Sequence, residues 1–129
     1  MSEIPDSPQK FVLTIDDEPD VLDVLKACLE SEGFRVLTAN GAREGLDMYE
    51  KRRQEIGLVL LDYVMPDMTG DLVFDCLRQI DPEVRVILLT ASEDHVARHM
   101  FEAGLRGYIQ KPFYLDDLLQ RVREELSQV

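Results

Sequence analysis

Short apolar runs alternate with amphipathic stretches along most of the chain, and this alternation limits the folds open to it. The runs that predict strands lie at residues 11–15, 34–39, 58–61, 84–89 and 107–110. The stretches between them carry apolar residues at helical spacing, as at Val21, Leu25 and Leu29. Five strands alternating with five helices predict an α/β fold, a doubly wound parallel sheet with helices on both faces.

The size and charge of the chain limit its possible functions. Its 129 residues, 45% of them hydrophobic, suffice for one core. We expect residues 1–9 to form a flexible N-terminal arm and residues 10–129 one folded domain. The 26 acidic and 14 basic residues give a formal net charge of −12, which argues against direct nucleic-acid binding. The sequence shows neither a membrane-span pattern nor a signal-peptide hydrophobic region, so we expect a cytoplasmic protein with no membrane partner.

Polar residues that could carry out chemistry or bind a ligand stand where four of the predicted strands end. Asp16 and Asp17 follow the first strand, Asp62 the third, Thr90 the fourth and Lys111 the fifth. Taken singly, the first pair could cap a helix, the threonine could satisfy a loop and the lysine could be a solvated surface residue. Asp62 is different, because it ends the most apolar run, where a carboxylate is costly to desolvate. In an open α/β sheet the carboxyl ends of the strands form the ligand-binding edge, so we expect the five residues to converge.

The chemistry of these residues suits phosphoryl transfer. Three carboxylates placed together repel one another unless their pKa values rise or a cation joins them. Oxygen ligands favour a hard divalent ion, and a site with room for water and phosphate oxygens favours Mg²⁺. A lysine ammonium and a threonine hydroxyl are suitable donors to phosphoryl oxygens. The nucleophile would be one of the aspartates, and Asp62 is the most protected candidate.

The segments at these strand ends also resemble those of a known family. They read IDDE at 15–18, LVLLDYVMPDMTG at 58–70, ILLTAS at 87–92 and GYIQKPF at 107–113. In this order they are similar to the motifs of response-regulator receiver domains, over roughly residues 10 to 127. The resemblance implies a flavodoxin-like fold with strand order 2-1-3-4-5.

The resemblance also implies roles for individual residues. Asp62 would accept a phosphoryl group from a phosphohistidine on a sensor histidine kinase or a histidine phosphotransfer protein. Thr90 and Lys111 would bind phosphoryl oxygens, and the Lys111–Pro112 peptide bond is expected to be cis. Asp17, Asp62 and the backbone carbonyl of Val64 would bind Mg²⁺ directly, and Asp16 would bind it directly or through water.

Tyr108 matches the switch aromatic of the family, although its position also fits an ordinary amphipathic edge-strand tyrosine. The resemblance implies that Thr90 moves toward the phosphoryl group and that Tyr108 rotates into the vacated space. This movement would alter the face formed by the fourth helix, fifth strand and fifth helix. An effector domain or a second copy of the chain could bind there.

Two other functions fit the same residues. The first is a Mg²⁺-dependent phosphohydrolase, but Val64 stands where such enzymes usually carry an acid/base aspartate. The second is an interaction module that works without phosphorylation, which the complete set of site residues disfavours. We therefore expect a phospho-accepting regulatory domain that assists its own phosphorylation and dephosphorylation, rather than an enzyme with an external substrate.

Two further features bear on packing and metal binding. Gly45 lies inside the second predicted helix, where glycine costs about 1 kcal/mol relative to alanine. His95 and His99 are four residues apart in the fourth predicted helix. This spacing can bind a metal, but no glutamate follows His95 and no third ligand is near, so a solvated helix face is the expected environment.

Overall fold

The fold is built on a parallel sheet of five strands. It is seen in a computed structural model that describes residues 9–128, so the predicted N-terminal arm lies outside the described residues except for its last residue. The strand order is β2-β1-β3-β4-β5, as predicted. The strands are β1 (Phe11–Asp16), β2 (Arg35–Asn40), β3 (Ile56–Asp62), β4 (Val86–Thr90) and β5 (Gly107–Gln110).

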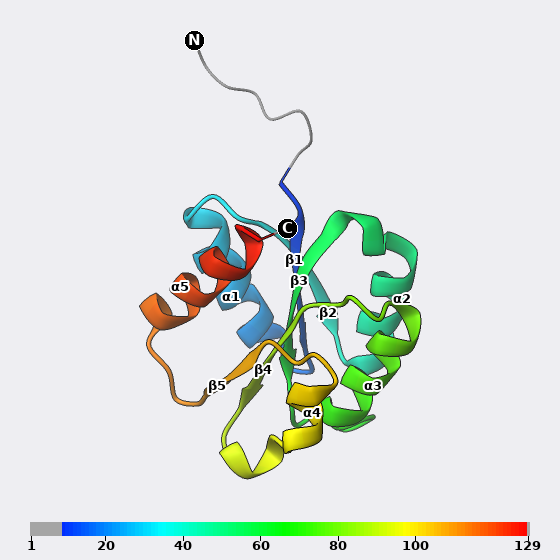
Figure 1. Ribbon diagram of the computed structural model, residues 1–129. Coiled ribbons are helices and arrows are strands. Elements are labelled where there is room, and N and C mark those ends of the chain that lie inside the picture. Colours follow the sequence, from blue (N-terminus) through cyan, green and yellow to red (C-terminus); the bar gives the residue numbers. More distant parts are fainter. Residues whose placement is uncertain (1–8, 129) are drawn as a thin grey trace.

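Helices cover both faces of the sheet, which confirms the doubly wound α/β fold (Figure 1). The main helices of the described residues are α1 (Pro19–Ser31), α2 (Ala42–Arg52), α3 (Gly70–Ile80), α4 (Arg98–Glu102) and α5 (Leu115–Leu126). Helices α1 and α5 pack on one face and helices α2, α3 and α4 on the other, giving two apolar cores. No helix within residues 9–128 is long and apolar enough to cross a membrane.

Strand β3 lies at the centre of the sheet, and all seven of its residues are buried. Strand β2 lies at one edge of the sheet, and of its six residues only Val36 and Ala39 are buried. The parallel register places Leu61 of β3 opposite Ile15 of β1, and Asp62 opposite Leu89 of β4. The residues that end these three neighbouring strands therefore meet at one edge of the sheet.

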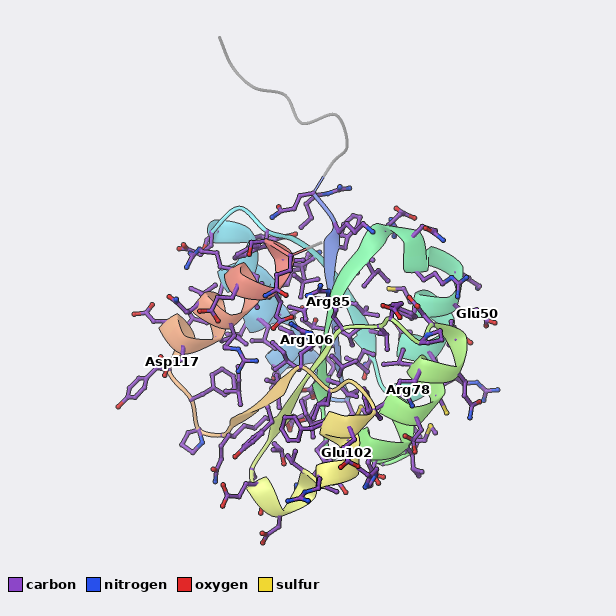
Figure 2. The ribbon with its side chains drawn as sticks, viewed as in Figure 1. Glu50, Arg78, Arg85, Glu102, Arg106 and Asp117 are labelled. Carbon is purple, nitrogen blue, oxygen red and sulfur yellow. The ribbon has the colours of Figure 1, made fainter. Side chains whose placement is uncertain are left out.

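Two ion pairs to the buried Glu125 attach the end of α5 to the sheet. The carboxylate of Glu125, which is buried, accepts hydrogen bonds from Arg85 Nη1 at 3.1 Å and from Arg106 Nε at 2.8 Å. Both arginines are labelled in Figure 2, and they come from the segments just before β4 and β5. Because two cations surround one buried anion, the Glu125 charge is fully compensated.

The segment between β4 and α4 differs from the sequence-based prediction. A helical pattern through both histidines was expected, but α4 contains only Arg98–Glu102, and His95 belongs to a separate 3-10 turn, η2 (Glu93–His95). Ser92 caps this turn, since its side-chain oxygen accepts a hydrogen bond from the Asp94 N–H at 3.1 Å. Val96 is then extended, with φ −107° and ψ 106°, which separates η2 from α4. The expected solvated face carrying both histidines is therefore wrong.

Gly45 marks a close approach between α2 and β1. A Cβ atom at this position would lie 2.5 Å from Cδ1 and 2.8 Å from Cγ1 of Ile15, whose side chain is buried. The propensity penalty of a glycine inside a helix is thus offset by the contact that its missing side chain permits. Helix α2 packs this near to the strand because residue 45 has no side chain.

Gly45→Ala should therefore destabilise the protein, by about 1–3 kcal/mol, although alanine is the better helix former. Asp47→Ala is the matched control, because Asp47 is exposed on the same helix and surface changes usually stay within about 0.5 kcal/mol. The measurement is the free energy of unfolding in urea. A gain in stability for Gly45→Ala would show that Ile15 moves aside without cost.

Candidate functional site

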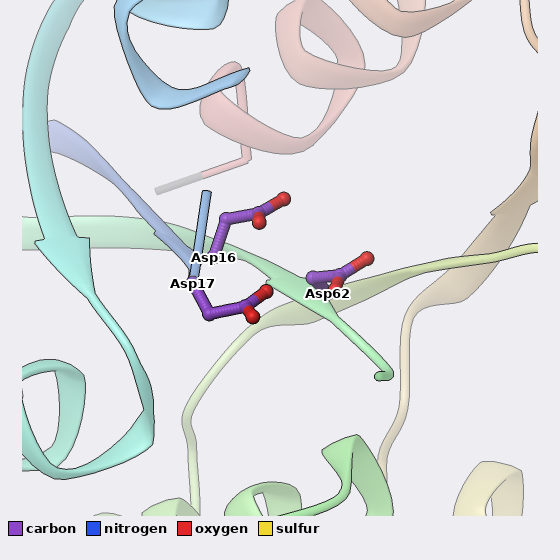
Figure 3. Close-up of side chains that lie close together, drawn as sticks. All are labelled: Asp16, Asp17 and Asp62. Carbon is purple, nitrogen blue, oxygen red and sulfur yellow. The ribbon is translucent and has the colours of Figure 1, made fainter. Parts of the chain in front are cut away.

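Three aspartates gather at the carboxyl edge of the sheet. Asp16 ends β1, Asp17 follows it, and Asp62 ends the neighbouring strand β3. One carboxylate oxygen from each residue lies within 4.8 Å of the others, and Figure 3 shows the three side chains side by side. Asp16 and Asp62 are only 3% and 5% exposed. The convergence expected for these carboxylates is therefore present in the fold.

The surroundings of two of these carboxylates, Asp16 and Asp62, disfavour their charged forms. Burial raises the pKa of Asp16 to about 6. A hydrogen bond from the Glu18 N–H lowers this pKa, and the negative charge of Asp62 raises it further. Burial also raises the pKa of Asp62, and the Lys111 ammonium opposes this rise. A divalent cation would supply the missing positive charge, and oxygen-only ligands suit a hard ion such as Mg²⁺. The residues present therefore fit such an ion.

Lys111 approaches the cluster from β5, two strands away from β3. Its ammonium is hydrogen-bonded and ion-paired to Oδ1 of Asp62. The Lys111 backbone N–H donates to the carbonyl of Thr90 at 2.7 Å, which fixes the start of the loop after β5. The Lys111–Pro112 peptide bond is cis, as expected. The structure thus places an anion-binding ammonium directly beside the predicted acceptor.

Thr90 ends β4, next to β3 in the sheet, and its side chain is buried. Its hydroxyl is hydrogen-bonded within the following loop, to the carbonyl of Ser92 at 3.1 Å and to Nδ1 of His95 at 2.6 Å. The His95 ring stacks on that of Tyr63, the residue after Asp62. Sequence reasoning missed this role of His95, because helical spacing alone placed the histidine in α4.

The two remaining predicted site residues lie at the margin of the cluster. Tyr108 is partly exposed on β5, and its hydroxyl donates to Glu93 Oε2 in η2 at 3.2 Å. Val64 lies in the loop after β3, with its side chain 63% exposed. Neither residue is among the three clustered carboxylates, and the ligand role predicted for the Val64 carbonyl stays a prediction.

The fold and the acidic edge of the sheet together define a class of signalling domain. The model of the response regulator receiver domain family matches residues 12–123. The chain therefore belongs to this family, and the resemblance found in the sequence is confirmed.

Relatives and solved structures agree with this assignment. The chain is 37% identical over 120 residues to an uncharacterized transcriptional regulatory protein, YkoG, of Bacillus subtilis, covering 91% of this chain and 51% of that protein. It is 35% identical over 113 residues to the transcriptional regulatory protein CpxR of Escherichia coli, covering 87% and 47%. The chain thus spans about half the length of these relatives.

Two solved structures illustrate the similarity of fold. A response regulator receiver domain protein from Clostridium thermocellum aligns with a TM-score of 0.85 at 29% identity, covering 92% of this chain and 95% of the other. The response regulator TrrA from Thermotoga maritima, in complex with Mg²⁺ and BeF, aligns with a TM-score of 0.79 at 31% identity, covering 89% and 97%. TrrA thus carries Mg²⁺ in that complex, and this chain has a cluster of three aspartates at the carboxyl edge of its sheet.

The raised pKa of Asp16 predicts how stability depends on pH without divalent cations. The pKa is 3.8 ordinarily and about 6 in the folded protein, so between these values the folded state binds more protons than the unfolded state. Stability should therefore fall as pH rises through this window. Asp16→Asn should remove the contribution of Asp16 to this effect, while that of Asp62 remains, and it should be more stable than wild type by about 1–3 kcal/mol above pH 6, with a smaller difference near pH 4.

The measurement is urea unfolding with a chelator at about pH 4 and pH 7, the two ends of the linkage window. Asp47→Asn provides a control for the loss of one exposed charge. If Asp16→Asn were less stable than wild type at neutral pH, the burial cost assigned to Asp16 would be wrong.

Proposed function

We propose that this chain is a phosphorylation-dependent switch of a two-component or phosphorelay system, in which Asp62 accepts the phosphoryl group. The observation that carries this proposal is the position of Asp62. Its carboxylate is buried at the end of the central strand, with two further carboxylates on one side and the Lys111 ammonium ion-paired to it. A nucleophile with anionic ligands for a cation and with a cationic donor beside it is arranged for phosphoryl transfer.

In the proposed reaction, the donor is a phosphohistidine on a sensor histidine kinase or a histidine phosphotransfer protein. An oxygen of Asp62 attacks phosphorus as the phosphorus–nitrogen bond breaks, and the imidazole leaves with the electron pair of that bond. The product is an acyl phosphate on Asp62. Lys111 leaves the carboxylate oxygen and contacts a phosphoryl oxygen, so the same ammonium balances the negative charge before and after transfer.

Residues of this chain would also hold the metal. Asp16, Asp17 and Asp62 supply carboxylate oxygens that lie within 4.8 Å of one another, and the Val64 carbonyl would complete the protein ligands. Bound Mg²⁺ would neutralise charge on the phosphoryl oxygens. Burial of Asp16 and Asp62 would strengthen their attraction for the cation, because bulk water screens charges less in a buried site.

The phosphorylated state would differ from the resting state at Thr90 and Tyr108. Thr90 would turn its hydroxyl to a phosphoryl oxygen, and Tyr108 would leave Glu93 and move inward, altering the face formed by α4, β5 and α5. Partners for this face are an effector domain or a second copy of the chain. The relatives are transcriptional regulators about twice as long as this chain, which favours a regulatory over a catalytic role.

The phosphorylation site is tested by replacing Asp62 with an isosteric amide. After incubation with a small phosphodonor and Mg²⁺, wild type should gain one base-labile phosphoryl group, whereas Asp62→Asn should gain none, since an amide cannot form the acyl phosphate. Asp67→Asn is the control, because Asp67 is exposed in the loop after β3. Intact-mass spectrometry measures the product. Equal labelling of wild type and Asp62→Asn would exclude Asp62 as the acceptor.

The proposed metal ligands are tested independently of phosphorylation. Asp17→Asn should weaken Mg²⁺ binding at least about tenfold, because few anionic ligands hold the ion. Glu18→Gln removes the same charge from the adjacent, exposed residue and should leave the affinity nearly unchanged. Calorimetric titration of both variants with Mg²⁺ gives the two affinities. If both lost affinity alike, general charge rather than coordination would explain the effect.

A further inference from the structure

His95 links the threonine at the end of β4 to the strand that carries the acceptor. Its Nδ1 lies 2.6 Å from the Thr90 hydroxyl oxygen. Its ring lies parallel to that of Tyr63, with centroids 4.0 Å apart and an angle of 5° between the planes. The backbone of Tyr63 is anchored to β4, since its N–H donates to the carbonyl of Leu89 at 3.0 Å. The imidazole is therefore held on one side by a ring and at its edge by a hydroxyl.

The single hydroxyl proton of Thr90 is already engaged in a hydrogen bond within the loop. A threonine hydroxyl has one proton to donate and two lone pairs. If the His95 Nδ1 carries a proton, the hydroxyl accepts from His95 and from the Ser92 N–H at 3.3 Å, and it donates to the Ser92 carbonyl at 3.1 Å. If Nδ1 is bare, the hydroxyl donates to His95. In either tautomer the single proton is already used inside the loop.

We infer that His95 is a positioning residue that holds the Thr90 hydroxyl in its resting orientation and so opposes binding of a phosphoryl group at Asp62. The inference rests on the proposed function, because it assumes that Thr90 must donate to a phosphoryl oxygen. Turning the hydroxyl toward Asp62 requires breaking the bond to His95 or the bond to Ser92. The 2.6 Å contact with His95 is the shortest that the hydroxyl makes.

The turn that carries His95 also contacts the second switch residue. The His95 N–H donates to the Ser92 carbonyl at 3.1 Å, the same carbonyl that accepts from Thr90. Glu93, at the other end of the turn, accepts from the Tyr108 hydroxyl at 3.2 Å. Thr90 and Tyr108 are thus both bonded to η2. Release of Thr90 from His95 therefore loosens the turn that also holds Tyr108.

The test separates the hydrogen bond from the ring stack. His95→Phe keeps a flat ring against Tyr63 but removes Nδ1, whereas His95→Asn removes the ring but keeps a polar atom bonded to Cγ where the imidazole has Nδ1. His99→Phe is the matched control, because His99 is exposed on α4. The probe is beryllofluoride, a mimic of the phosphoryl group, with saturating Mg²⁺, and calorimetry measures its affinity.

His95→Phe should bind beryllofluoride roughly three- to tenfold more tightly than wild type, which corresponds to the loss of one net hydrogen bond. The affinity of His95→Asn for beryllofluoride should lie within about twofold of the wild-type affinity, and that of His99→Phe should equal the wild-type affinity. Unchanged or weaker binding by His95→Phe would overturn the inference. Binding by His95→Asn as tight as that by His95→Phe would also overturn it, because a polar atom at the Nδ1 position would then fail to restore the wild-type affinity.

Wild type separates failure of this inference from failure of the proposed function. If wild type binds beryllofluoride and His95→Phe binds it equally, only the role of His95 is wrong. If wild type neither binds beryllofluoride nor accepts a phosphoryl group, the proposed function fails and the inference fails with it. Far-UV circular dichroism melting of each variant identifies any change caused by unfolding. If His95→Phe does not fold, a second substitution, His95→Leu, provides a variant without Nδ1.

Discussion

The ion pair between Lys111 and Asp62 is the interaction on which the carboxyl edge of the sheet depends. Asp62 ends a strand that is buried along its whole length, and an isolated charge in this position would be strongly unfavourable. Lys111 reaches it from the other side of β4, so the ion pair links strands that are not neighbours. The same contact opposes the rise in the Asp62 pKa that burial causes, and it holds a cation where the proposed phosphoryl transfer would need one.

The acidic cluster shows a conflict between stability and binding. Burial raises the pKa of Asp16 to about 6, so the charged form is held at a cost to the folded protein. A cation bound between the carboxylates would remove this cost and stabilise the folded state in proportion to its affinity. Burial of Asp16, with a smaller contribution from the neighbouring charge of Asp62, would thus favour a bound cation, since carboxylates that lack a compensating charge gain more from a cation than carboxylates already paired.

The sequence predicted the sheet, its strand order through the family resemblance, and the residues at the strand ends. Asp62 was recognisable because a carboxylate after an apolar run requires a special environment. The features that the sequence did not predict come from tertiary contacts. Gly45 looked like a weak point of a helix, but Ile15 occupies the space beside it. His95 fitted a helical spacing, yet it lies in a capped turn against Tyr63. Long-range partners of this kind cannot be read from local periodicity.

The resting state at β4 is held by several weak contacts, which makes it easy to reverse. A neutral hydrogen bond contributes about 0.5–1.5 kcal/mol net, and one to an ionised group is about twice as strong. A phosphoryl oxygen can therefore compete for the Thr90 hydroxyl against the bonds that Ser92 and His95 supply. A stronger resting network would hold the threonine too firmly for one phosphoryl group to move it. Without any such network, the resting and phosphorylated states would not differ at Thr90. The bond to His95 strengthens the resting network, so in the proposed switch the identity of residue 95 would adjust the fraction of molecules in the active state at a given level of phosphorylation.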